Sequence, residues 1–148
     1  MYDAVVQMSM GICMRYADGR DEAQDMLQDG FVKVFERIGT LKDSEGVIAW
    51  VRNIMVNTCI DHHRRRRHWL PIDEENEPPS DYSFDPFGVE DIVKGLQQLT
   101  PMLRTVFNMC EVEGYTHEEV AQKLKSSNVA VRVALSRAKE QLRKYLTK

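Results

Sequence analysis

Residues 47–67, VIAWVRNIMVNTCIDHHRRRR, decide how the chain is interpreted, because as a helix this stretch has two different faces. Apolar and small side chains recur at three- and four-residue steps, as on a core-facing stripe. They are Val47, Val51, Ile54, Met55, Thr58 and Cys59. Another face holds Trp50, Asn53, Asn57, Asp61 and Arg64, and leads into Arg65, Arg66 and Arg67. This basic run suits a phosphate backbone, although a solvated, arginine-rich helix end is the simpler alternative.

The composition is that of a soluble globular protein, with 43% hydrophobic and 29% charged residues in a chain of 148. No apolar run approaches the roughly 20 residues of a membrane helix, and no secretory leader precedes the first helix. The three cysteines, Cys13, Cys59 and Cys110, lie far apart in apolar patterns without a CxxC spacing. This argues against a disulfide framework or a zinc site. We expect a cytoplasmic protein with no cofactor and no membrane insertion.

The charge is distributed in blocks, and the net charge of −3 conceals them. Residues 73–91 contain eight acidic residues and no lysine or arginine. Residues 115–148 contain eight lysines and arginines against three glutamates. A basic C-terminal block is compatible with nucleic acid despite the acidic total.

The first 65 or so residues are expected to form three helices, with a stop near Asp18-Gly19 and a polar loop at residues 39–46 before the third helix. Val5, Met8, Ile12 and Tyr16 predict one helix. A second helix, DEAQDMLQDGFVKVFERI at residues 21–38, is expected to be capped by Asp21. Its apolar stripe comprises Ala23, Met26, Leu27, Gly30, Phe31, Val34, Phe35 and Ile38. Its opposite face is either plain surface or a docking face, and it holds Asp25, Gln28, Asp29, Val32, Lys33 and Glu36.

Residues 69–90 differ from the rest of the chain in composition. They contain four of the five prolines among many acidic residues, which predicts a linker, because such a stretch buries little apolar surface. The chain is therefore divided into two small modules, residues 1–68 and residues 91–148.

The second module is predicted to contain a helix-turn-helix. Thr100-Pro101 starts one helix, and Thr116 with Glu119 forms a capping box at the start of a short helix. A tight polar turn leads from there to a long final helix. The first turn of that helix would enter a major groove, where asparagine and arginine recognise base edges. The alternative is a helical hairpin with a basic outer face.

Taken in order, four motifs resemble those of the bacterial sigma factors of the extracytoplasmic-function (ECF) group. They are DEAQDMLQDGFVKVFERI, AWVRNIMVNTCIDHHRRRR, LTPMLRTVFNMCEVEGYTHEEVAQKL and VALSRAKEQLRKYL. The resemblance covers nearly the whole chain. It implies an all-α protein with two small helical domains: sigma domain 2 at residues 1–68 and a helix-turn-helix sigma domain 4 at residues 91–148. A flexible acidic linker at residues 69–90 would join them.

The resemblance further implies a transcription initiation factor that binds core RNA polymerase and promoter DNA. The helix at residues 21–38 would dock on the clamp helices of the largest subunit, and the second domain would meet the flap of the second-largest subunit. The polymerase-binding residues would be Asp25, Gln28, Asp29, Val32 and Lys33. An anti-sigma factor is expected as a further partner.

In the same resemblance, the −10 element is bound as a melted single strand and the −35 element as duplex. The −10 residues would be Leu41, Lys42, Asp43, Ser44, Asn53, Asn57, Arg64, Arg65 and Arg66. The −35 residues would be Ser127, Asn128, Ala130, Arg132, Val133, Ser136 and Arg137.

This chain departs from the family at two places. Family members commonly have threonine, serine and arginine where this chain has Ala130, Val133 and Ala134, so that three polar contact groups are missing. Either the −35 sequence that this chain recognises is unusual, or its −35 contact is weak. They also usually have more chain ahead of the position of Tyr2, which implies a further segment upstream.

Other classes of function explain less of the sequence. A helix-turn-helix regulator that binds duplex DNA without polymerase leaves residues 21–38 and the arginine run unexplained. A purely protein-binding helical module leaves both basic blocks unexplained. The sequence shows no nucleophile–base pair, phosphate loop or metal-ligand set, so we do not expect an enzyme.

Overall fold

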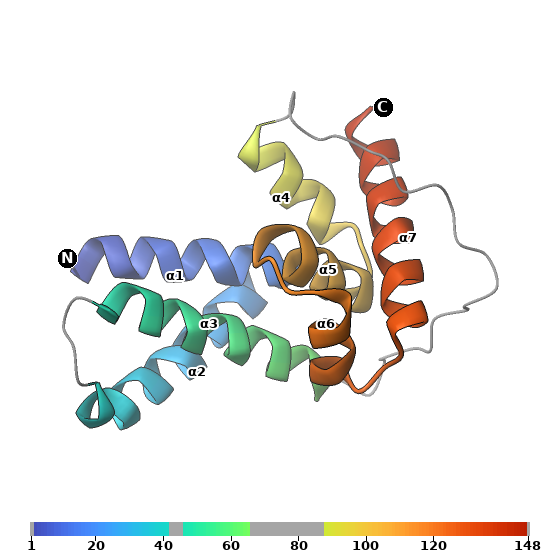
Figure 1. Cartoon of the computed structure of the whole chain (residues 1–148). Helices are drawn as coiled ribbons and strands as arrows, with labels where there is room; N and C mark the ends of the chain where they lie inside the picture. Colours follow the sequence, from blue (N-terminus) through green and yellow to red (C-terminus); the bar gives the residue numbers. More distant parts are fainter. Residues whose placement is uncertain (1, 42–45, 66–87, 148) are drawn as a thin grey trace. The chain divides into compact units, whose positions relative to one another are not determined.

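The computed structural model describes residues 2–41, 46–65 and 88–147, and all regular elements in this part of the chain are helical. The helices form two compact units, residues 1–65 and residues 66–148. Figure 1 labels the helices of both units. The predicted all-α fold is confirmed. The predicted linker at residues 69–90 lies outside the described residues except for its last three positions.

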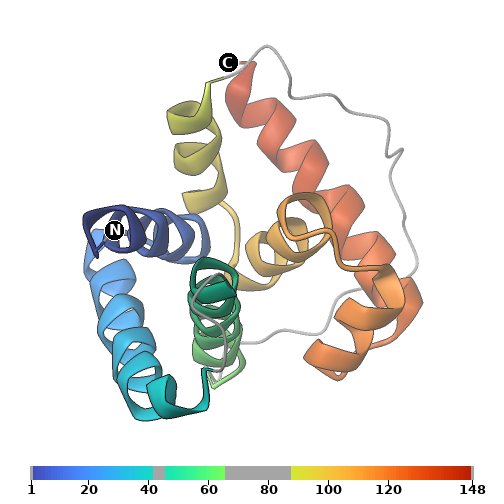
Figure 2. The same cartoon turned by 60° about the vertical axis from the view of Figure 1, so that its left-hand side comes forward.

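The first unit consists of α1 (Tyr2–Tyr16), α2 (Arg20–Arg37), the short 3-10 helix η1 (Ile38–Thr40) and α3 (Val47–Arg64). Each of the three α-helices packs against the other two, and Figure 2 shows them from the side of the N-terminus. Gly30 of α2 allows α3 to approach closely, because a Cβ there would lie 2.3 Å from Met55 Sδ. The side chain of Met55 fills this space and is fully buried.

Two details of α2 differ from the sequence prediction. Phe35 and Ile38 were expected in the core but are 65% and 53% exposed. The core of this unit covers α2 only as far as Val34, the last buried residue of the helix. The apolar spacing continues to Phe35 and Ile38, but the other helices of the unit do not bury these two side chains. Asp21 is not the cap: the helix starts at Arg20 after Gly19, and no side chain caps it.

The α1–α3 contact contains polar and sulfur atoms. His63 of α3 is fully buried, and its Nε2 forms a hydrogen bond with the carbonyl oxygen of Tyr16 at the end of α1. One turn earlier in both helices, Cys59 Sγ lies 3.9 Å from Cys13 Sγ. These two contacts fix the register of α1 and α3, which run side by side in the same direction (Figure 1).

The second unit consists of α4 (Val89–Gln97), α5 (Pro101–Phe107), a π-helical turn η3 (Asn108–Val112), α6 (His117–Leu124) and α7 (Asn128–Leu146). The long α7 packs against α4, α5 and α6. Gly95 is where α4 meets α7, because a Cβ there would lie 2.3 Å from Leu142 Cδ1. The order α6, turn, α7 is the predicted helix-turn-helix.

The helix starts of this unit agree with the sequence prediction. Thr100 Oγ1 accepts a hydrogen bond from the backbone N–H of Leu103, and Pro101 occupies the first helical position. The backbone N–H of Thr116 donates to Glu119 Oε1 and that of Glu119 donates to Thr116 Oγ1, both at 3.1 Å. These bonds satisfy N–H groups that a helix leaves without partners in its first turn.

A buried arginine joins α4 to α5, and the sequence analysis did not identify it. The side chain of Arg104 is fully buried. Its Nε donates to the carbonyl oxygen of Leu96 and its Nη2 to that of Leu99, both at 2.8 Å. These carbonyls belong to the last turn of α4 and the loop after it. A guanidinium has five donors in a fixed fork, and so it can satisfy two such acceptors at once.

Candidate functional site

The outer face of α2 is the first candidate surface. Asp25, Gln28, Asp29 and Val32 are exposed, and Lys33 is half-buried. The first four lie at steps of three, one and three, so that they share one face of the helix. The exposed Phe35 lies beside this face, toward the C-terminal end of α2. Lys33 and the exposed Glu36 continue the face beyond Val32, so the surface is mainly charged and polar, with one exposed valine on it and Phe35 beside it.

The second candidate surface lies along α3. Asn53, Asn57, Arg64 and Arg65 are exposed, whereas Trp50 is half-buried. Asn53 and Asn57 are one helical turn apart, so that their amides point in similar directions. Amides and guanidiniums supply the donors and acceptors that unstacked bases and phosphates require.

Part of the predicted −10 set is not described. Leu41 follows η1 and is half-buried. Lys42, Asp43, Ser44 and Arg66 lie outside the described residues.

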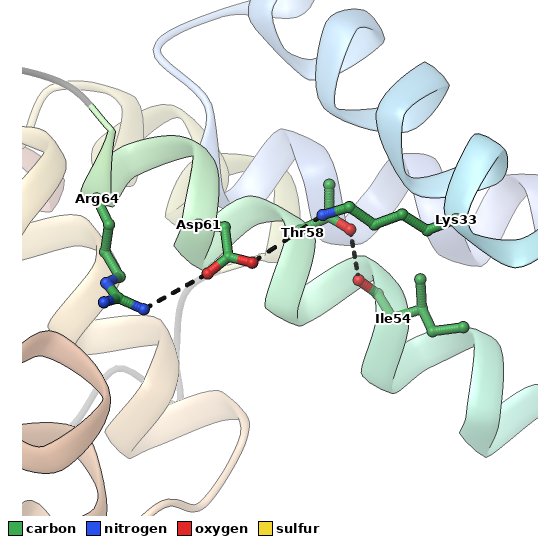
Figure 3. A network of polar contacts seen from close by, with 5 residues as sticks. All are labelled: Lys33, Ile54, Thr58, Asp61 and Arg64. Carbon is green, nitrogen blue, oxygen red and sulfur yellow. Dashed lines mark hydrogen bonds and ion pairs between the residues drawn. The ribbon is translucent and has the colours of Figure 1, made fainter. Parts of the chain in front are cut away.

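The two surfaces meet at a groove between α2 and α3. Asp61 lies at this junction (Figure 3): its Oδ2 is 4.0 Å from Lys33 Nζ and its Oδ1 is 3.6 Å from Arg64 Nη1. Thr58, one turn before, turns inward and donates its hydroxyl to the carbonyl oxygen of Ile54 at 2.7 Å. The groove has a volume of about 240 Å³ and is lined by Asp29, Val32, Lys33, Glu36, Thr58, Asp61, His62 and Arg65. Residues from both candidate surfaces therefore share one groove.

The third candidate surface is the start of α7. Asn128 and Arg132 are exposed and Arg137 is half-buried. Ser127 is exposed but already has a structural role, because its hydroxyl caps α7 by accepting from the backbone N–H of Ala130 at 3.0 Å. The polar groups at this surface are thus one amide and two guanidiniums, with a serine that fixes the start of the helix.

Three of the predicted −35 residues do not lie on this surface. Ala130, Val133 and Ser136 are buried, with at most 6% exposure. Ala134, the third position at which the chain departs from the family, is fully buried as well. At Ala130, Val133 and Ala134 the polar family residues are thus replaced by apolar side chains in the interior of this structure. Of the predicted −35 residues, Ser127, Asn128 and Arg132 are therefore the exposed ones, and Arg137 is half-buried.

Two lysines near the helix-turn-helix interact with other residues of the same unit. Lys139 Nζ lies 2.8 Å from Glu111 Oε1, and Lys123 Nζ lies 5.3 Å from the centre of the Tyr115 ring. An amino group over an aromatic face is a cation–π contact. These two lysines hold α7 and α6 to the preceding segment, whereas Arg132 is exposed.

Two titratable groups among the described residues, Cys110 and Tyr115, have raised pKa values. Burial raises the pKa of the Cys110 thiol to about 11, with Glu111 adding to the rise and Lys139 opposing it. Burial also raises the pKa of Tyr115. Both groups therefore remain protonated at neutral pH.

Within residues 2–41, 46–65 and 88–147, no three histidine, cysteine, aspartate or glutamate side chains gather in a group that could hold a metal ion. The helices in the same part of the chain include none that is long and apolar enough to span a membrane.

Two family models match the chain. Sigma-70 region 2 matches residues 1–68, and Sigma-70 region 4 matches residues 90–142. Among curated proteins, the RNA polymerase sigma-H factor of Pseudomonas aeruginosa is 24% identical, over 93% of this chain and 79% of the relative. The ECF RNA polymerase sigma factor SigE of Mycolicibacterium smegmatis is 29% identical, over 93% of this chain and 56% of the relative. The RNA polymerase sigma factor CarQ of Myxococcus xanthus is 30% identical, over 84% of this chain and 74% of the relative.

A similar solved structure is the sigma factor RpoE of Bartonella quintana, which was crystallised with the anti-sigma factor NepR. It aligns with a TM-score of 0.58 and 19% identity, covering 97% of this chain and 92% of that one. At this identity the likeness concerns the fold.

Proposed function

Because the chain belongs to the ECF group of the sigma-70 family, we propose that it binds core RNA polymerase and directs it to specific promoters. The protein supplies recognition, and the polymerase supplies the chemistry of transcription. Its place of work would accordingly be the cytoplasm. We assign residues 1–68 to sigma domain 2, residues 69–90 to a linker and residues 91–148 to sigma domain 4.

One observation carries this proposal: the N-terminal unit presents two different exposed surfaces on adjacent helices. The face of α2 is acidic with an exposed valine on it and an exposed phenylalanine beside it, which suits a protein. The face of α3 carries amides and guanidiniums, which suit a nucleic acid. A regulator that binds duplex DNA alone would need only the helix-turn-helix unit. The match of residues 1–68 to Sigma-70 region 2 also argues against that alternative.

We assign polymerase docking to α2. Asp25, Gln28, Asp29 and Val32 would contact the clamp helices of the largest subunit, and Lys33 would lie at the edge of that contact. The exposed acids favour a basic partner surface, because complementary charges accelerate association and disfavour wrong partners. The second unit would contact the flap of the second-largest subunit. An anti-sigma factor would compete for one or both of these surfaces.

We assign −10 recognition to α3 and the segment before it, and −35 recognition to α7. On the melted strand, Asn53 and Asn57 would bond to base edges while Arg64 and Arg65 would neutralise phosphates. On duplex DNA, Asn128 and Arg132 would enter the major groove, where asparagine pairs with adenine and arginine with guanine. Arg137 would contact the backbone.

The docking assignment is tested by measuring the affinity of the full-length chain for core RNA polymerase. We expect Asp25→Arg to weaken binding by roughly tenfold or more, because it places a cation against a basic partner surface. Asp3→Arg is the matched control: it makes the same charge change at an exposed position of α1 in the same unit. Equal affinities for wild type, Asp25→Arg and Asp3→Arg would contradict the assignment to α2.

The −35 assignment is tested separately with duplex promoter DNA. Arg132→Ala is expected to cost about 1–3 kcal/mol of specific binding. Lys94→Ala, an exposed cation on α4, should change that affinity much less. If both variants bind as wild type does, α7 does not contact the bases through Arg132.

A further inference from the structure

Cys13 and Cys59 are brought together by the fold in a way that their sequence positions do not indicate. They are 46 residues apart in the chain, on α1 and α3, and their Sγ atoms are 3.9 Å apart. Both residues are fully buried, and both are reduced. The third cysteine, Cys110, lies in the other unit and is also free. The chain therefore contains a buried pair of thiols and a separate single thiol.

The surroundings hold this pair in place. One turn further along both helices, the hydrogen bond between His63 Nε2 and the Tyr16 carbonyl fixes how α1 lies against α3. The two sulfur atoms are in van der Waals contact, and a disulfide requires them to approach to about 2.05 Å. Rotation of the two side chains about their Cα–Cβ bonds moves the sulfur atoms without moving the helices.

We propose that Cys13 and Cys59 form an oxidisable dithiol, which a small hydroperoxide converts reversibly to an intramolecular disulfide that ties α1 to α3. In the first step one thiol loses its proton and the thiolate attacks one oxygen atom of the peroxide. The O–O bond breaks, the sulfenic acid forms, and the departing hydroxide takes up the thiol proton and leaves as water. In the second step the other sulfur attacks the sulfenic sulfur and displaces a second water. Two thiols and one hydrogen peroxide thus give one disulfide and two waters, and the peroxide accepts the two electrons. A thiol reductant restores both thiols.

Burial of the pair determines which oxidants act on it. A full burial of both sulfur atoms excludes large disulfide reagents from the folded state, whereas hydrogen peroxide is nearly as small as water. Access then depends on local opening of α1, which makes the reaction slower than that of an exposed thiol. The neighbouring thiol captures the sulfenic acid as soon as it forms, and so protects it from irreversible oxidation to the sulfinic acid. Cys110 has no second cysteine in its own unit, so the same reaction is not open to it.

The disulfide would act on the helix that carries Asn53, Asn57, Arg64 and Arg65. It closes the segment between α1 and α3 covalently, which reduces the conformational freedom of the unfolded chain. We expect the oxidised N-terminal unit to unfold at a higher temperature than the reduced one. This inference goes beyond the proposed function and does not depend on it, because neither cysteine belongs to an assigned contact surface.

The test uses the full-length chain and three single variants, Cys13→Ala, Cys59→Ala and Cys110→Ala. Each protein is treated with hydrogen peroxide, unfolded without reductant and alkylated, and the alkyl groups are counted by intact mass. The reduced wild type accepts three groups. We expect the oxidised wild type to accept one group, at Cys110, with peptide mapping showing a Cys13–Cys59 crosslink. A thiol reductant should restore all three.

The variants make the result specific. Cys110→Ala retains the pair, and it should lose both alkylation sites on oxidation and show the rise in thermal midpoint. Cys13→Ala and Cys59→Ala should form no intramolecular crosslink and show no rise, with circular dichroism confirming that each is folded. The proposal is overturned if the Cys13 and Cys59 thiols can still be alkylated in wild type and Cys110→Ala after peroxide treatment. It is also overturned if the crosslinks that form involve Cys110. Binding to core polymerase is not measured in this test, so its outcome is independent of the docking assignment.

Discussion

Replacing the buried guanidinium of Arg104 by an apolar side chain of similar length, in Arg104→Met, should destabilise the C-terminal unit. The variant leaves the carbonyls of Leu96 and Leu99 without the donors that reach them at 2.8 Å. The Leu96 carbonyl keeps the backbone N–H of Leu99, at 3.1 Å. A hydrogen bond from a charged donor contributes about 1.5–3 kcal/mol, so the loss of both bonds to the guanidinium costs roughly 3–6 kcal/mol. Removing the desolvation cost of a buried cation offsets part of this loss. We expect a net loss of about 3 kcal/mol.

Hydrogen exchange measured by mass spectrometry separates this effect from the stability of the N-terminal unit. The backbone amides of α4 and α5 should exchange about 100-fold faster in Arg104→Met, because 1.36 kcal/mol corresponds to a factor of ten. Exchange in α1 and α3 should not change. Arg104→Lys should lie between wild type and Arg104→Met, because one ammonium cannot imitate the fork of donors.

Arg132→Met, the same substitution at an exposed position of α7, is the control for Arg104→Met. It should change stability by less than about 0.5 kcal/mol. If Arg104→Met leaves the exchange of α4 and α5 as slow as in wild type, the two hydrogen bonds do not hold these helices together.

Three further predictions concern the C-terminal unit. Gly95→Ala places a methyl group 2.3 Å from Leu142 Cδ1. Overpacking should cost about 1–3 kcal/mol, which exceeds the gain in helix propensity of about 1 kcal/mol. Urea denaturation measures the resulting decrease in the free energy of unfolding. Thr116→Ala removes the capping box and should cost about 1 kcal/mol in the same assay. Because the pKa of Cys110 is raised from 9.0 to about 11, its thiolate fraction at pH 7 should be about 100-fold below that of an ordinary cysteine, as alkylation rates will show. The unfolded chain loses this proton first, so stability should fall as pH rises from about 9 through about 11.

The helix starts of the C-terminal unit and the order of elements were predictable from the sequence because the signals are local, whereas Asp21 gave a misleading signal for the start of α2. The backbone N–H groups in the first turns of α5 and α6 are satisfied locally, by Thr100 and by the Thr116–Glu119 pair. The residues that cap these helices are therefore the same residues that predict the helix starts in the sequence. The helix-turn-helix follows from such starts and from the apolar spacing of the last helix. The N-terminal helix pattern was equally clear, although the end of its apolar stripe was not.

The features that were missed depend on residues distant in the chain. Arg104 lies in an apolar stretch, and its burial depends on carbonyls supplied by α4. Phe35 continues the spacing of a buried stripe, but the core of its unit no longer covers that part of α2. The proximity of Cys13 and Cys59 depends on the register between α1 and α3, which no local pattern encodes.

The contact residues are a different case. Asn53, Asn57, Asn128 and Arg132 are exposed in the structure, whereas Ala130, Val133 and Ser136 are buried. Which bases the exposed side chains contact depends on the promoter DNA and the polymerase, so the assignments are predictions about that complex.

In vitro transcription with purified core enzyme on a randomised promoter library measures directly whether this chain gives core RNA polymerase its promoter specificity. We predict transcripts from a defined subset of promoters when both core enzyme and chain are present, none when the chain is omitted, and a strong loss with Asp25→Arg but not with Asp3→Arg. A chain that binds duplex DNA but neither associates with core enzyme nor supports transcription would contradict the account.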